Sequence, residues 1–361
     1  MAIHRLKILS IAVLVIGVGM LLFGTWQNAN AAESSKPNIV ILATGGTIAG
    51  AAATGTQSGY TSGAVTIDAM LAAVPGIAEL ANVRGEQISN VGSQDMSFEI
   101  LLKVAKRINE LGPDVDGVVI THGTDTMEES AFFLNLTVKT SKPVVMVGSM
   151  RPSTAVSADG PLNLYNAVAV AADPQAGGRG VLVVMNDQIH AAHSLTKTST
   201  TAVETFQSPI RGVVGIASYG KNDYYQSPEW PHTTQSEFDI AGVTSLPRVD
   251  VIFMSVDMSP DLITASANGG AKGIVIAGVG NGNLNKPSVD AAAAAVKKGV
   301  VVVRASRVPT GLVGRNVELD DDALGFIASD ELNPQKARIL LTLALLEKRT
   351  PEDLQQLFRT Y

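Results

Sequence analysis

Short apolar runs, each followed by a polar turn and then by a segment expected to be helical, recur along this chain and limit the folds open to it. The run Gly117–Thr121 is rich in β-branched residues, the turn His122–Thr126 is polar, and an expected helix begins at Met127. Runs of the same kind occur at residues 38–43, 87–91, 143–148 and 180–186. Because strands that alternate with helices usually pair in parallel through right-handed crossovers, the pattern predicts an α/β fold with a mostly parallel sheet.

The alternation is interrupted once, at residues 226–247, where Pro228, Pro231 and Pro247 occur and no periodicity is sustained. Apolar runs then resume at residues 249–254, 273–277 and 300–303. A stretch that is rich in proline and lacks periodicity is typical of a connection between domains. The sequence therefore predicts an N-terminal α/β domain at residues 36–225, a linker at 226–247 and a C-terminal α/β domain at 248–361.

Composition excludes several classes of function. The 361 residues carry a formal charge of −6, and no basic stripe is visible, so we expect no nucleic-acid partner. The absence of cysteine excludes disulfides, thiolate metal sites and a cysteine nucleophile. The five histidines show no HxxxH or HExxH spacing. We therefore expect neither a metal nor another cofactor.

The N-terminus has the organisation of a secretory signal peptide. Arg5 and Lys7 precede the uncharged apolar run Ile8–Phe23, and Ala29–Ala31 offers a cleavage site of small residues. We predict that residues 1–31 are removed and that the mature protein is periplasmic or secreted. The alternative is an uncleaved membrane anchor, because the apolar run is only slightly shorter than a spanning helix.

Hydroxyl side chains follow several expected strands, at the edge where ligands bind in open α/β sheets. Thr47, Ser93 and Thr124 lie at such positions, and Lys197 lies in the polar segment 189–205. A threonine hydroxyl is a weak nucleophile until a base takes its proton. A desolvated Lys197 could act as that base for Thr124, while the aspartate that follows Thr124 orients the lysine or binds a substrate ammonium.

Residues 50–63 consist almost entirely of small residues and Gln, and Tyr60 is their single large side chain. The glycines give this segment conformational freedom, so we interpret it as a mobile lid, with a plain flexible loop as the alternative. From such a lid Tyr60 could act as the base for Thr47. Backbone amides of the glycine-rich loops could form an oxyanion hole.

Two plainer interpretations compete with a catalytic one. Thr126 and Glu129 have the spacing of a capping box, so the whole turn could be an ordinary helix cap. The loop 45–50 is glycine-rich, which suggests dinucleotide binding. However, its first two glycines are adjacent, unlike those of G-x-G-x-x-G, and Asp68, at the distance of a ribose contact, falls in an expected helix.

Two longer stretches resemble the signature motifs of the bacterial type II L-asparaginases. They are Ala43–Gly50, with the sequence ATGGTIAG, and Thr121–Glu129, with the sequence THGTDTMEE. Further blocks that resemble the family lie at residues 92–96, 150–153, 157–161, 278–283 and 306–311. The resemblance runs from about Pro37 to Tyr361, whereas residues 189–195, with two histidines, match no block of the family.

This resemblance implies roles that spacing alone does not give. Thr47 corresponds to the primary nucleophile of the family, and Tyr60 corresponds to the tyrosine that supports it. Thr124, Asp125 and Lys197 correspond to a second triad-like group around the scissile amide. Which threonine attacks first stays open.

The resemblance also implies the substrate contacts. Ser93, Gln94 and Asp125 correspond to the groups that hold the α-carboxylate and the α-ammonium of the substrate. Asn283 and Glu318 correspond to residues lent by a neighbouring subunit, where Glu318 also completes the tyrosine group. No role remains for the imidazole of the THGTDT motif, so we expect His122 to be structural.

The implied fold is a larger N-terminal catalytic α/β domain with a flavodoxin-like sheet and a smaller C-terminal parallel α/β domain. The implied assembly is a homotetramer made of two intimate dimers. The implied reaction is the hydrolysis of L-asparagine to L-aspartate and ammonia, without a cofactor.

The preferred amide is predicted from a few positions. Asn281, Asn283 and Val308–Thr310 resemble the asparagine-preferring pattern of the family. A single methylene separates asparagine from glutamine, and a binding site typically discriminates it by about 1–3 kcal/mol. We therefore expect weaker glutaminase activity. The alternatives are a glutaminase-first enzyme and a non-catalytic periplasmic amino-acid-binding protein.

Overall fold

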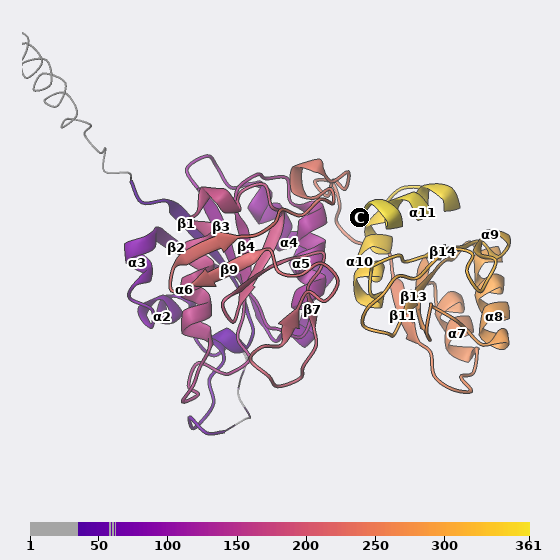
Figure 1. Cartoon of the computed structure of the whole chain (residues 1–361), viewed down its shortest axis with the longest axis horizontal. Helices are drawn as coiled ribbons and strands as arrows, with labels where there is room; N and C mark the ends of the chain where they lie inside the picture. The colour runs from indigo at the N-terminus through magenta and orange to yellow at the C-terminus, as the bar shows by residue number, and fades with distance from the viewer. Residues whose placement is uncertain (1–34, 58, 60, 62) are drawn as a thin grey trace, which may run out of the picture. The chain divides into compact units, whose positions relative to one another are not determined.

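The computed structural model describes residues 35–57, 59, 61 and 63–361 (Figure 1). The predicted signal peptide and Tyr60 lie outside the described residues. Contacts divide the chain into Met1–Lys36 and Pro37–Tyr361, and the second unit contains the sheets described below. No helix of the described residues is long and apolar enough to cross a membrane.

The larger sheet has eight strands in the order β10-β9-β6-β5-β4-β3-β1-β2. Their bounds are β1 Asn38–Gly45, β2 Asn82–Val91, β3 Gly117–Thr121, β4 Val144–Val147, β5 Val181–Met185, β6 Gln188–Ala191, β9 Gly215–Ser218 and β10 Lys221–Tyr224. The neighbours β2, β1, β3, β4 and β5 pair in parallel. The pairs β5–β6, β6–β9 and β9–β10 are antiparallel. The parallel part has the flavodoxin-like order 2-1-3-4-5, and this confirms the predicted α/β fold class.

Helices cover both faces of this sheet (Figure 1). They are α4 Phe98–Asn109 and α5 Met127–Thr137 with one core, and α2 Ile67–Ala72, α3 Ile77–Leu80 and α6 Gly160–Ala171 with the other. Alternate side chains of one strand serve the two cores: Val40 and Leu42 pack in the first, Ile39 and Ile41 in the second. Strands that are buried on both faces need apolar residues at every position, which explains the continuous β-branched runs.

Helix α5 begins at Met127 as expected, but the capping box predicted for it is wrong. The side chains of Thr66, Ser97 and Asn333 accept cap hydrogen bonds at the starts of α2, α4 and α10. Thr126 occupies the N-cap position of α5 but makes no side-chain cap, because its Oγ1 donates to the carbonyl of Ser93 at 2.8 Å. The predicted capping box with Glu129 is therefore absent.

The smaller sheet has four parallel strands in the order β11-β12-β13-β14. Their bounds are β11 Val249–Phe253, β12 Gly273–Gly278, β13 Val301–Ser306 and β14 Phe326–Ala328. The helices are α7 Asp261–Asn268, α8 Lys286–Lys297, α9 Asp321–Leu324, α10 Pro334–Ala344 and α11 Pro351–Thr360. This sheet forms the expected smaller C-terminal α/β domain, although β14 was not predicted. Helix α10 packs against both α5 and β12.

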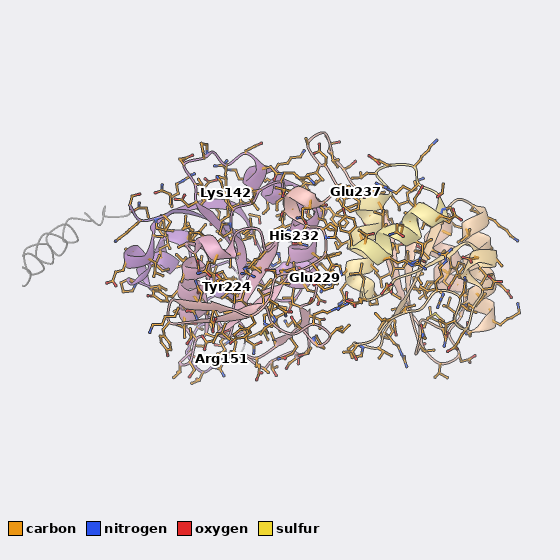
Figure 2. The ribbon with its side chains drawn as sticks, turned by 45° about the horizontal axis from the view of Figure 1, so that its top comes forward. Lys142, Arg151, Tyr224, Glu229, His232 and Glu237 are labelled. Atoms are coloured by element: carbon orange, nitrogen blue, oxygen red, sulfur yellow. The ribbon has the colours of Figure 1, made fainter. Side chains whose placement is uncertain are left out.

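The segment between β10 and β11 carries Glu229, His232 and Glu237, which are labelled in Figure 2. Within residues 226–247 the structure has a single short helical turn, η4 at Thr233–Gln235. The segment is nevertheless bonded to its surroundings, since Ser236 Oγ donates to the carbonyl of Leu136 at 2.6 Å. The predicted domain boundaries stay a prediction.

The segment 189–205, expected to be a polar loop, contains two strands. Strand β6 pairs antiparallel with β5, and its His190 is 1% exposed. Strand β7, Thr196–Lys197, pairs with β8, Phe206–Gln207. Strands this short carry too few residues to show a period in the sequence, so their pairing was missed.

Candidate active site

The candidate site begins where the order of the larger sheet changes direction. Strand β1 lies between β2 and β3. The chain thus adds β2 on one side of β1 and β3, followed by the later strands, on the other. At such a switch point the loops beyond the carboxyl ends of the two strands diverge and leave room for a ligand. Thr47, in the short helix η1 Thr47–Ala49, follows β1, and Thr124 follows β3.

Two glycines bring these loops into main-chain contact. A Cβ atom placed on Gly46 would lie 2.3 Å from the nitrogen of Gly123, and φ of Gly46 is 85°. A Cβ atom placed on Gly123 would lie 2.6 Å from Ser93 Oγ. Only glycine permits this approach. Thr47 and Thr124, each one residue past these glycines, are both buried, with exposures of 6% and 5%.

Lys197 links the hydroxyl and the carboxylate of the β3 loop. Its Nζ lies 2.9 Å from Thr124 Oγ1 and 2.7 Å from Asp125 Oδ1. The lysine side chain is 17% exposed, whereas that of Asp125 is 61% exposed. A mostly buried ammonium therefore bridges a buried hydroxyl and a solvent-facing carboxylate. The structure brings together the three residues that the sequence placed in one group.

Ser93 joins this group from a third strand end. It opens η2, Ser93–Asp95, directly after β2, and it is 4% exposed. Its Oγ accepts a hydrogen bond from the backbone N–H of Asp125 at 3.1 Å. Gln94 is exposed, and its Nε2 donates to Asp95 Oδ2 at 3.1 Å. Ser93 thus contacts the β3 loop, whereas the hydrogen bond of Gln94 stays within η2.

Residues that the sequence did not reveal hold the Lys197 segment. The backbone N–H of Lys197 donates to Glu128 Oε2 at 3.3 Å, and Gln335 of α10 donates to the other oxygen of Glu128. Lys336 of α10 donates from Nζ to the carbonyl of His193 at 2.6 Å. Burial lowers the pKa of Lys336 to about 8, an effect that the charge of Glu128 partly opposes. Nothing in the local sequence of α10 signals these contacts, because they join residues more than a hundred positions apart.

The described residues of the predicted lid are hydrogen-bonded to their neighbours. Ala51 and Thr61 exchange two backbone hydrogen bonds, of 3.1 and 3.0 Å. The amide of Ala52 donates to Thr154 Oγ1, and the carbonyl of Gly50 accepts from Ser153. The mobility of this segment stays a prediction, and Tyr60 itself is outside the described residues.

Asn283 and Glu318 form a separate pair on the smaller sheet. Asn283 Nδ2 donates to Glu318 Oε2 at 2.6 Å, and Glu318 is exposed. Between the described residues of this chain, no hydrogen bond joins the pair to Thr124, Asp125 or Lys197. The residues predicted for the site thus form two groups within one chain, one on each sheet.

His122 contributes no charge near neutral pH. It is fully buried, and its Nδ1 lies 2.6 Å from the carbonyl oxygen of Gly123. Burial lowers the pKa of its imidazole to about 4. A neutral ring that contacts the main chain fits the structural role expected for it.

Comparison with protein families identifies the family to which both sheets belong. The family described as asparaginase, N-terminal matches residues 38–230, and the glutaminase/asparaginase C-terminal domain matches residues 248–358. The chain belongs to the asparaginase family. The resemblance stated from the motifs is thereby confirmed, and with it the expectation of an amidohydrolase enzyme.

Individual members of the asparaginase family align over most of the chain. A protein of Haemophilus influenzae named probable L-asparaginase periplasmic is 54% identical, and the alignment covers 92% of this chain and 95% of that protein. The glutaminase-asparaginase of Pseudomonas fluorescens biotype A is 45% identical over 95% and 96% of the two chains. The crystal structure of a probable cytoplasmic L-asparaginase from Campylobacter jejuni matches with a TM-score of 0.88 at 47% identity, covering 90% and 100%.

Proposed function

We propose that this enzyme hydrolyses L-asparagine to L-aspartate and ammonia through a threonine ester. The contact of Lys197 Nζ with Thr124 Oγ1 and Asp125 Oδ1, at the switch point of the sheet, carries the proposal. A hydroxyl, an ammonium and a carboxylate within hydrogen-bonding distance are the parts that proton transfer to and from a threonine requires. Membership of the asparaginase family supplies the substrate class.

The reaction proceeds in two steps. Thr47 Oγ1 attacks the side-chain amide carbon, the C–N bond breaks, and ammonia leaves with the proton that the hydroxyl released. Water then attacks the ester, which frees aspartate and restores the hydroxyl. The Thr124–Lys197 pair carries the proton to the leaving nitrogen in the first step and accepts one from water in the second. Tyr60 is assigned to support Thr47, as the family resemblance implies.

Recognition of the substrate requires groups for both of its charged ends. Ser93 and Gln94 are assigned to the α-carboxylate, and Asp125 is assigned to the α-ammonium. Asn283 and Glu318 are proposed to come from a neighbouring subunit, where Glu318 binds the ammonium and completes the Tyr60 group. This sharing is supported by the separation of the two groups within one chain.

The shared site implies an oligomer. We propose a homotetramer of two intimate dimers, in which a monomer is nearly inactive. We also propose a periplasmic location after removal of residues 1–31. The name of the Haemophilus relative supports that location, whereas the Campylobacter structure is named as cytoplasmic. N-terminal sequencing of the exported protein decides between cleavage and an intact Met1.

The proposed reaction is tested by removing each threonine hydroxyl. Thr47→Ala and Thr124→Ala should each lower ammonia release from asparagine by at least about a hundredfold, since nucleophile and proton relay both act on the transition state. Thr137→Ala is the matched control, because Thr137 is also buried, yet its Oγ1 only donates to the carbonyl of Phe133 in α5. Full activity in both test variants would contradict the proposal, and tight asparagine binding without turnover by the unaltered protein would indicate a binding protein.

Mass spectrometry of acid-quenched enzyme identifies the nucleophile. An aspartyl adduct on the peptide that contains Thr47 supports the assignment. An adduct on the peptide that contains Thr124 reverses the roles of the two threonines but keeps the reaction.

The second candidate function is a glutaminase-first enzyme, which the 45% identity to a glutaminase-asparaginase favours. We propose asparagine as the better substrate, because Asn281, Asn283 and Val308–Thr310 follow the asparagine-preferring pattern. The ratio of kcat/KM for the two amides decides the question. We expect asparagine to lead by about 1–3 kcal/mol, which is about five- to two-hundred-fold. A ratio below one would establish the glutaminase-first alternative.

A further inference from the structure

The smaller sheet contains a fully buried ion pair that the proposed reaction does not use. Arg304, on β13, is 1% exposed, and Asp321, at the start of α9, is 0% exposed. Arg304 Nε and Nη2 each donate to one carboxylate oxygen of Asp321, both at 2.6 Å. A buried ion pair adds little to stability by itself, because desolvation offsets the attraction. Its remaining contacts therefore indicate what it does.

The guanidinium of Arg304 also contacts two separate loops. Its Nη1 donates to the carbonyls of Asn281 and Gly282, each at 3.1 Å, and its Nη2 donates to the carbonyl of Gly314 at 3.0 Å. With the two bonds to Asp321, all five N–H groups of the arginine are used. One side chain thus connects β13 to the loop after β12 and to the loop before α9.

Each of these loops carries one member of the exposed pair. The first loop leads from Asn281 to Asn283, which exchanges backbone hydrogen bonds of 3.0 and 2.8 Å with Val279. The second loop leads to Glu318, and Asp321 Oδ2 accepts the backbone N–H of Asn316 within it at 2.8 Å.

The two loops are also bonded to each other, since Asn281 Oδ1 accepts the N–H of Gly314 at 2.8 Å. Close packing reinforces this bond. A Cβ atom placed on Gly282 would lie 2.8 Å from a methyl carbon of Val313 and 3.1 Å from Arg304 Nη1. The positions of Asn283 and Glu318 therefore depend on Arg304 from both sides.

We propose that Arg304 and Asp321 are positioning residues that fix the Asn283–Glu318 pair for use in the active site of the neighbouring subunit. This inference rests on the proposed function, in which that pair binds the substrate of another chain. Arg304 touches neither substrate nor reacting atoms. Its effect should therefore appear on the site of the partner and not on the Thr124–Lys197 group of its own chain.

The first test separates substrate binding from turnover. Arg304→Lys keeps the charge beside Asp321 but cannot reach both loops, because an ammonium has three donors and no planar fork. We expect KM for asparagine to rise about tenfold or more, with a smaller change in kcat, since contacts to a charged substrate are displaced. A KM equal to that of the unaltered enzyme would overturn the proposal.

Arg248→Met is the matched control for this test. Arg248 directly precedes β11 of the same sheet and also binds an aspartate through two nitrogens, with distances of 2.9 and 2.7 Å to Asp250. Its third contact is the carbonyl of Gly269, so it touches neither loop of the pair. We expect the KM of the Arg248→Met variant for asparagine to be unchanged.

The second test asks on which chain Arg304 acts. Chains with Thr124→Ala and chains with Arg304→Lys carry different tags and are co-expressed, and the hybrid dimers are purified. In each hybrid, one site combines an intact Thr124 from the Arg304→Lys chain with an intact Asn283–Glu318 pair from the Thr124→Ala chain. The other site combines the altered Thr124 with the displaced pair. At subsaturating asparagine we therefore expect about half of the unaltered activity. A hybrid no more active than a physical mixture of the two altered homo-oligomers would show that Arg304 acts within its own chain, and it would overturn the proposal.

A second hybrid distinguishes failure of this inference from failure of the proposed function. Glu318→Ala chains combined with Thr124→Ala chains should also regain activity if the site is shared. If they do and the Arg304 hybrid does not, the positioning role alone is wrong. If Glu318→Ala homo-oligomers are fully active, the shared site is wrong, and the positioning role is rejected with it.

Discussion

The loops after β1 and β3 and the loops that carry Asn283 and Glu318 are fixed in different ways. The first two touch through the main chains of Gly46 and Gly123, and neutral hydrogen bonds also hold the β3 loop to Ser93, which follows β2. The second two are joined by a buried guanidinium. Neither pair of loops has regular secondary structure at its point of contact, so each requires a specific device to hold it.

The difference follows from what precedes the loops. Residues just beyond adjacent parallel strands inherit their positions from the sheet, so short neutral contacts are sufficient to align them. The loops that carry Asn283 and Glu318 run further from the strands before them, which end at Gly278 and Ser306. A group with five fixed donors can hold several carbonyls of such loops at once. The comparison teaches that the protein buries the Arg304 guanidinium where the sheet alone does not fix the positions of the loops.

The largest expected effect concerns the buried ion pair. Arg304→Met leaves Asp321 charged and unpaired in the core, which should lower the free energy of unfolding by about 3–5 kcal/mol. The measurement is chemical denaturation at a fixed subunit concentration. Adding Asp321→Leu should recover much of the loss, because the uncompensated charge is then removed. A loss below about 1 kcal/mol for Arg304→Met would contradict the comparison.

The next effect concerns the glycine contact. In Gly46→Ala the new methyl overlaps the main chain of Gly123, so the loops that carry Thr47 and Thr124 must separate. Ammonia release should fall by about a hundredfold or more, since a displacement of about 1 Å has that effect on catalysis. Gly178→Ala is the control: its φ is 72°, but no atom lies within 4 Å of the added Cβ. Gly178→Ala should keep its activity; a similar loss in both variants would attribute the effect to backbone strain instead of to the contact.

Acid sensitivity should distinguish the two halves of the chain. Burial, assisted by the charges of Lys336 and Arg211, lowers the pKa of His193 to about 3, and burial lowers that of His190 to about 4. The unfolded chain binds these protons near pH 6.5 and the folded chain does not, so stability is lost as pH falls through this range. Residues 248–361 contain no histidine.

His193→Phe keeps the ring that stacks on Trp230 at 3.8 Å but cannot be protonated. Between pH 7 and pH 5 the unaltered protein should lose about 2 kcal/mol relative to this variant, as proton linkage predicts. Parallel denaturation series at the two pH values measure the difference. Identical pH profiles for the two proteins would show that folding does not lower the pKa of His193.

The smallest effect concerns a single neutral hydrogen bond between the β3 loop and Ser93, which follows β2. Thr126→Val removes the bond from Oγ1 to the carbonyl of Ser93 and should cost about 1 kcal/mol of stability. Glu129→Gln should have no comparable effect, because α5 has no side-chain cap for it to complete. An unchanged Thr126→Val variant would contradict the contribution of this hydrogen bond.

Much of the fold could be predicted from local pattern. The continuous β-branched runs indicated the parallel strands β1, β3, β4 and β5, because strands buried on both faces require them. The same reasoning missed β6, β9, β10 and β14, which have three or four residues each. The antiparallel extension also depends on pairing between segments that are remote in sequence, which no local pattern reports.

The candidate site was predicted in a similarly uneven way. The Thr124–Asp125–Lys197 group followed from residue chemistry at a strand end and from the family resemblance. The groups behind it did not: Gln335 and Lys336 act across more than 130 positions of sequence, and Arg304 appears in the sequence as one arginine in an apolar strand. Supporting residues are chosen by the three-dimensional arrangement of the loops, so their sequence neighbourhood carries no signal.

The contact between Gly46 and Gly123 has a consequence for how new substrate preferences can arise. At this contact there is no side chain to exchange, so selection for a larger or smaller amide must act on other positions. If the site is shared as proposed, those include the loops that a second subunit lends. Preference would then belong to the neighbour as much as to the chain that carries the nucleophile, and two diverged copies expressed in one cell would trade specificities whenever they assembled together.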